Sequence, residues 1–163
     1  MTRIHESVLA ASPPSVAVRG LERYIESKQN VLTLTVPLRS LGLPVELGIS
    51  QSVCVKFTSE QRSPLTTGRR NEGISLQWEA EGGGPFPKFS GVLIIRPHSG
   101  QSELELKGSY VPPLGEIGAA FDAVIGNKVA TATVRALLEN LKEVLEQEFA
   151  AFKEAVQQEP LRS

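Results

Sequence analysis

Between Val31 and Tyr110, hydrophobic and polar side chains alternate with a period of two residues. Such alternation is typical of antiparallel strands with one buried and one solvated face, whereas strands buried on both faces form continuous apolar runs. Short connections rich in Gly and Pro separate the runs. The pattern therefore predicts an antiparallel sheet with strands in residues 3–10, 31–38, 45–57, 74–80, 89–95 and 104–110.

Helical periodicity begins directly after the first strand. Ser12 followed by two prolines is typical of an N-cap and the first turn of a helix. Apolar positions then recur at helical spacing from Ala17 to about Lys28. Because Gly20 interrupts this segment, we expect two short helices here, with a single helix as the alternative.

A long amphipathic helix is predicted near the C-terminus. Apolar side chains recur with a period of 3.6 from Ile117 to Val156, and charged side chains cover the opposite face. We expect a bend at Gly126-Asn127 and an apolar stripe that packs against the sheet along the helix. The tail, residues 160–163, is expected to fray.

The expected fold class is α+β, with a curved antiparallel sheet of six to seven strands around the long C-terminal helix. A seventh strand would lie in the polar segment Thr58–Gly73 or arise from a division of residues 45–57. Six strands at about 4.8 Å spacing are roughly 29 Å wide, whereas a helix is about 10–12 Å thick. The sheet must therefore curl around the helix, and space that the helix does not fill becomes an apolar cavity.

Length and composition restrict the class of protein. A chain of 163 residues with 40% hydrophobic side chains is expected to form one domain, residues 1–163, with an ordered core of about 3–157. A net charge of −1 predicts no nucleic-acid binding, and the apolar runs are too short for stable membrane insertion. One cysteine excludes an internal disulfide, and we expect a cytoplasmic protein of unknown oligomeric state.

The element order, with the segment Gly108-Ser-Tyr-Val-Pro-Pro-Leu-Gly115 leading into the long helix, resembles the START-like (SRPBCC) helix-grip superfamily. This superfamily includes polyketide cyclase/dehydrase proteins, plant pollen allergens and lipid-transfer domains. The resemblance covers about residues 3–156. It implies a cavity between the sheet and the last helix that holds a lipid, sterol or polyketide-like molecule, and it transfers no catalytic motif.

The candidate ligand-binding residues are the larger side chains expected to face this cavity. Tyr110 and Trp78 stand out because a buried hydroxyl or indole N–H needs a hydrogen-bond partner, which a ligand could supply. Gln51 interrupts an apolar face and could orient a ligand. The full set is Gln51, Trp78, Phe89, Leu93, Leu106, Tyr110, Phe121 and Ile125. Each of them could equally be an ordinary core residue.

Other chemically active side chains form no recognisable cluster. Glu6 also interrupts an apolar face, so it must lie at a rim, pair with a cation or face a wet cavity. His5, His98 and Cys54 are expected on outward or turn positions. Arg62, Arg69 and Arg70 lie in the polar segment, where they could meet an anionic head group or simply be solvated. We expect neither a metal nor another cofactor.

Three functions remain open on this basis. The first is binding or transport of a small hydrophobic ligand in the cavity. The second is a cyclase or dehydratase in which Glu6 and Tyr110 move a proton within the same cavity. The third is a protein-interaction or co-chaperone module that uses the loop arginines or the outer face of the sheet.

Overall fold

A computed structural model describes residues 2–38, 50–58, 73–82, 86–111 and 123–158, with backbone only for 123–125 and 158. The strands are β1 (Thr2–Ala10), β2 (Val31–Pro37), β3 (Ser50–Thr58), β4 (Ile74–Ala80), β5 (Lys88–His98) and β6 (Gln101–Val111). The helices are α1 (Pro14–Ser27) and α3 (Ala123–Gln158). Each predicted strand is confirmed within a few residues, except that residues 45–49 lie outside the described part.

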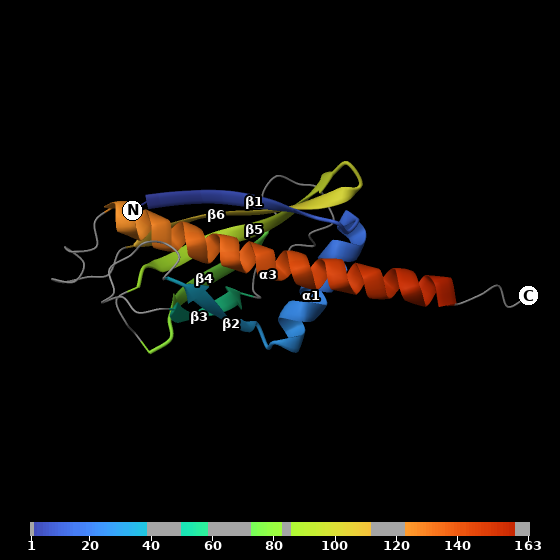
Figure 1. Ribbon diagram of the computed structural model, residues 1–163, viewed down its shortest axis with the longest axis horizontal. Coiled ribbons are helices and arrows are strands. Elements are labelled where there is room, and N and C mark those ends of the chain that lie inside the picture. The colour runs from blue at the N-terminus through green and yellow to red at the C-terminus, as the bar shows by residue number, and fades with distance from the viewer. Residues whose placement is uncertain (1, 39–49, 59–72, 83–85, 112–122, 159–163) are drawn as a thin grey trace, which may run out of the picture.

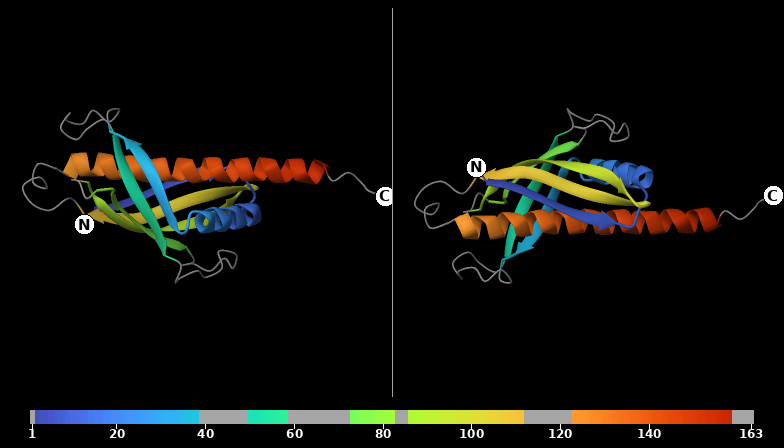
Figure 2. Two further views of the ribbon diagram at one scale, coloured as in Figure 1. Left: turned by 90° about the horizontal axis from the view of Figure 1, so that it is seen from below. Right: turned by 90° about the horizontal axis from the view of Figure 1, so that it is seen from above.

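The six described strands form one antiparallel sheet in the order β1-β6-β5-β4-β3-β2. Helix α3 contacts both edge strands, β1 and β2, and also β6. One helix can reach both edges only if the sheet curls, and Figures 1 and 2 show the strands wrapping around the first half of α3. The expected α+β fold with a curved sheet is confirmed.

The segment after β1 forms one helix, so the expectation of two short helices is wrong. Gly20 lies inside α1 and is buried. A β-carbon at this position would lie 3.2 Å from Cδ2 of Leu145 and would meet the Glu148 carboxylate, both on α3. The glycine therefore permits close approach of the two helices instead of breaking α1.

The expected N-cap at Ser12 is also wrong. The N-cap residue of α1 is Pro13, in an extended conformation, and no side chain caps the helix. Ser12 is buried, and its carbonyl oxygen accepts a hydrogen bond of 2.6 Å from the Ser102 hydroxyl. This hydrogen bond links the segment just before α1 to β6.

Helix α3 continues without interruption through Gly126 and Asn127, where we expected a bend. Its apolar stripe is buried from Val129 to Leu145, as expected. The stripe does not pack against the sheet along its full length, because Phe152 and Val156 are more than half exposed. Figure 1 gives the reason: the C-terminal turns of α3 extend beyond the sheet. No described helix is both long and apolar enough to cross a membrane.

Several sequence predictions fall outside the described residues. These are the polar segment between residues 59 and 72, with its three arginines, and the tail from residue 159. The location of a seventh strand also stays a prediction for this reason.

A buried carboxylate on the outer face of β6 ties three strands together. The Glu105 side chain is only 7% exposed and lies 2.7 Å from Lys107 Nζ, 3.3 Å from Arg96 Nε and 3.4 Å from His5 Nε2. Burial alone would raise the pKa of Glu105. The hydrogen bond from Lys107 and the charges of Arg96, Lys107 and His5 outweigh burial and hold this pKa below its usual value.

Glu105→Gln is expected to lower the free energy of unfolding by about 1–2 kcal/mol at neutral pH. A lowered folded-state pKa contributes stability that is fully present above the unfolded value of about 4.3 and is lost as pH falls through the folded pKa. The difference between the two proteins should therefore shrink in acid. Urea unfolding as a function of pH measures it, and an undiminished difference in acid would contradict this account.

Candidate functional site

An aromatic row crosses the inner face of the sheet on three neighbouring strands. Trp78 of β4 pairs directly with Phe89 of β5, and Phe89 pairs in turn with Tyr110 of β6. The three side chains are each 2% exposed. Three of the predicted ligand-binding residues, taken from segments far apart in the sequence, therefore meet in one row.

The Trp78 and Phe89 rings are stacked with centroids 4.0 Å apart and an interplanar angle of 10°. A glycine pair, Gly91 and Gly108, makes room for the Phe89 ring. A β-carbon on Gly91 would lie 2.6 Å from Cε1 of Phe89, and one on Gly108 would meet the same ring. The Phe89 ring thus lies flat over two positions that have no side chain.

Two polar groups in the aromatic row lack a partner among the described residues. The Trp78 indole nitrogen is buried and has no hydrogen-bond acceptor, which leaves a donor unsatisfied at a cost of about 1–3 kcal/mol. The Tyr110 hydroxyl likewise makes no hydrogen bond with any described residue. A β-carbon on Gly126 of α3 would lie 3.3 Å from that hydroxyl, so the helix glycine gives the tyrosine space.

The remaining predicted ligand-binding residues are not part of the aromatic row. Leu93 pairs with Leu106 on the same face, and both are fully buried. Gln51 lies at the far end of β3 and its amide donates a 2.9 Å hydrogen bond to the Ser52 carbonyl, so it does not join the aromatic row. Phe121 lies outside the described residues, and the side chain of Ile125 is likewise not described.

Glu6 lies at the edge of the inner face, opposite Leu106. Its carboxylate is 3.5 Å from Nε of Arg135 on α3, so the charge is paired at a rim. Tyr110 is four residues further along β6 than Leu106, which corresponds to about 13 Å. The geometry therefore does not bring Glu6 and Tyr110 together as a proton-transferring pair.

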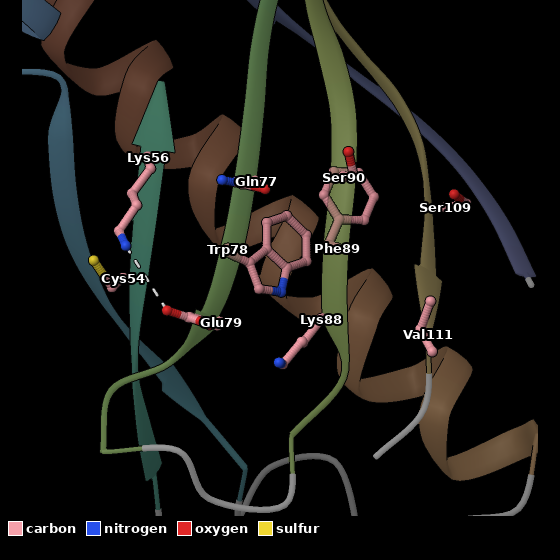
Figure 3. A pocket seen from close by; sticks show the side chains of 10 residues that line it. All are labelled: Cys54, Lys56, Gln77, Trp78, Glu79, Lys88, Phe89, Ser90, Ser109 and Val111. Atoms are coloured by element: carbon pink, nitrogen blue, oxygen red, sulfur yellow. Dashed lines mark ion pairs between the residues drawn. The ribbon is translucent and has the colours of Figure 1, made fainter. Parts of the chain in front are cut away.

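A pocket opens where β4 and β5 separate. Their pairing ends at Trp78 and Phe89, although β4 continues to pair with β3 up to Ala80 and β5 pairs with β6 from Lys88 onward. The pocket has a volume of about 250 Å³ and is shown in Figure 3. Its lining consists of Cys54, Lys56, Gln77, Trp78, Glu79, Lys88, Phe89, Ser90, Ser109 and Val111.

Sequence reasoning missed most of this pocket. Only Trp78 and Phe89 among the predicted ligand-binding residues line it, and the remaining lining residues alternate onto the outer face. The alternation of side chains predicts a solvated surface at these outward positions. The place where two paired strands separate depends on register, for which the sequence carried no signal.

His5 and Cys54 occupy the outward positions expected of them, whereas His98, expected in a turn, is the last residue of β5. His5 pairs with Glu105, and His98 lies 3.8 Å from Glu103. Cys54 is half-buried and reduced, on the outer face of β3. Within the described ranges, no group of three or more His, Cys, Asp or Glu side chains could hold a metal ion.

Comparison with known proteins supports the fold alone. No protein-family model and no curated protein matches this sequence significantly. Among solved structures, a conserved protein from Geobacillus kaustophilus has a TM-score of 0.52 and 14% identity, covering 92% of this chain and 96% of that one. This likeness shows a shared fold, a curled antiparallel sheet around a long C-terminal helix, as the sequence predicted.

Two further solved structures carry functional names. A START superfamily protein from Mycobacterium smegmatis has a TM-score of 0.44 and 15% identity over 89% of this chain and 97% of that one. The Zhui aromatase/cyclase from Streptomyces sp. R1128 has a TM-score of 0.43 and 13% identity, over 90% and 93%. These names describe those proteins, and their activities do not transfer at such distances.

Gly108→Ala is expected to lower the free energy of unfolding by about 1–3 kcal/mol, because the added methyl group forces the Phe89 ring out of place. It would also lie 2.7 Å from the α-carbon of Gly91. Ser109→Ala, one residue along on the outer face, is the matched control and should change stability by less than about 0.5 kcal/mol. Chemical denaturation measures both, and equal stability of the two variants would refute the proposed packing.

Phe89→Ala is expected to cost about 3–5 kcal/mol of stability and to expose Trp78 to acrylamide quenching. Trp78 is the single tryptophan of the chain, so its fluorescence reports on this row alone. Phe152→Ala is the control, because Phe152 is 53% exposed and should be nearly neutral. Similar losses in the two variants would show that Phe89 is not a core residue.

Proposed function

We propose that this protein, acting as a single domain, binds or transports a small hydrophobic ligand between the inner face of the sheet and α3. The ligand would be a lipid, a sterol or a polyketide-like molecule. The observation that carries the proposal is the aromatic row, in which the buried Trp78 N–H lacks an acceptor among the described residues. A ligand oxygen next to Trp78 or Tyr110 would satisfy a group that none of the described residues pairs with.

The surroundings of this row suit an apolar molecule. Leu93 and Leu106 continue the apolar surface beyond the glycine pair, and both are fully buried. Burial of apolar ligand surface would drive binding at about 25 cal/mol per Å², before ordering costs are subtracted. The two aromatic polar groups would then set the orientation of the ligand.

Binding is favoured over a cyclase or dehydratase reaction by the position of Glu6. Its carboxylate pairs with Arg135, and the strand register places it about 13 Å from Tyr110 along the sheet. A reaction would need an acid–base pair within reach of one substrate atom. The interaction module has no comparable observation in its favour.

Native mass spectrometry of freshly purified protein tests the proposal. We expect an excess mass that is lost on denaturation, or binding of at least one of three added probes: oleate, cholesterol and emodin. A bare polypeptide mass together with no binding of any probe would overturn the proposal.

Tyr110→Phe is expected to leave the free energy of unfolding within about 1 kcal/mol of the parent, because the hydroxyl makes no hydrogen bond among the described residues. The same variant should weaken binding of the oxygen-bearing probe that the parent prefers by about fivefold to tenfold. Calorimetric titration measures the affinity. Leu93→Ala is the contrast, since it should cost about 2–5 kcal/mol of stability.

A further inference from the structure

The pocket between β4 and β5 faces away from α3, because all of its lining side chains except Trp78 and Phe89 lie on the outer face of the sheet. We propose that this pocket is a second binding site, for a small aromatic monoanion such as an aromatic carboxylate. The pocket lies on the opposite face of the sheet from the site of the proposed function. Because the Trp78 N–H can donate to only one ligand at a time, protection of Cys54 in the outer pocket is what distinguishes the two sites.

Charge at the pocket favours an anion. Lys56 and Lys88 both line it, and Glu79 is the acidic residue among the lining. Lys56 Nζ already lies 3.8 Å from the Glu79 carboxylate, so these two charges offset each other. Lys88 makes no ion pair within the described part of the chain. Counting the described residues alone, the pocket therefore keeps one uncompensated positive charge, at Lys88.

The unpartnered Trp78 N–H belongs to the same pocket. Figure 3 shows the indole nitrogen on the side of the ring that faces Lys88, in the space where the two strands separate. The tryptophan is 2% exposed, and no described residue provides an acceptor for its nitrogen. A carboxylate placed between the Lys88 ammonium and the indole N–H would accept from both donors.

Size and lining favour an aromatic body for this anion. A cavity of about 150 Å³ accommodates benzene, so a pocket of about 250 Å³ suits one or two fused rings. The stacked Trp78 and Phe89 rings provide an apolar wall, and Val111 is 45% exposed at the rim. Ser90 and Ser109 form a cross-strand pair of small side chains that leaves the floor open.

The first experiment is a titration of the full chain, labelled with ¹⁵N, with naphthalene-2-carboxylate. Because Trp78 is the single tryptophan, its indole N–H gives one resolved signal. We expect this signal to shift on binding, and we expect naphthalene-2-methanol, the neutral analogue, to bind at least about tenfold more weakly. High salt should weaken binding of the carboxylate selectively.

Variants of the exposed lysines locate the charge. Lys88→Met should weaken binding of naphthalene-2-carboxylate about tenfold or more, whereas Lys88→Arg should stay within about threefold of the parent. Lys56→Met should have a small effect, because Lys56 already pairs with Glu79. Lys128→Met, an exposed lysine on α3 that does not line the pocket, is the matched control and should bind like the parent.

Cys54 distinguishes the outer pocket from the inner face. It is the single cysteine and lines the outer pocket, so a ligand there should slow its alkylation by iodoacetamide. A ligand on the inner face should leave that rate unchanged, since the sheet lies between.

Protection of Cys54 together with dependence on Lys88 supports the outer site. The proposal is overturned if the carboxylate does not bind, if the alcohol binds equally well, or if Lys88→Met binds like the parent. It is also overturned if the indole signal shifts while Cys54 alkylation is unaffected. That last result would place the ligand on the inner face and so leave the proposed function standing.

Discussion

The whole structure depends on one constraint: one long helix, with only the short α1 beside it at β5 and β6, must cover a sheet that is more than twice as wide as a helix. Helix α3 meets this constraint by contacting both edge strands, which forces the sheet to curl. The inner face then becomes concave, and side chains from distant strands converge on it. The position of Gly20 follows from the same need for close packing, because α1 must lie directly against α3 near Leu145.

The inner face combines a closely packed region with polar groups that have no partner in the described part of the chain. Phe89 fills the space above Gly91 and Gly108, and Trp78 stacks on its other side. Protein cores rarely leave a buried N–H unpaired, so the indole of Trp78 marks a place where the fold retains a costly feature. In a ligand-binding site, a ligand oxygen could accept the hydrogen bond that the Trp78 N–H does not make with any described residue.

The separation of β4 from β5 also makes Trp78 part of the lining of the outer pocket. Strand pairing ends at Trp78 and Phe89, while each strand keeps its other neighbour. The same two aromatic residues therefore form part of the inner core and one wall of the outer pocket. Lys88 stands directly beside Phe89 in the sequence, so alternation places a cation on the outer face next to an aromatic ring on the inner face.

Alternation along the chain by itself determined the strands, their faces and the burial of Trp78, Phe89, Leu93, Leu106 and Tyr110, because a period of two assigns each side chain to one face. Prediction from the sequence pattern failed where contacts with other elements decide the local structure. Gly20 was expected to break a helix, Ser12 to cap it, and Phe152 to reach the sheet, and each outcome depended on another element. Only the tertiary structure decided the Glu6–Arg135 pair, the aromatic row and the outer pocket, because register and strand separation arise from pairing between distant segments.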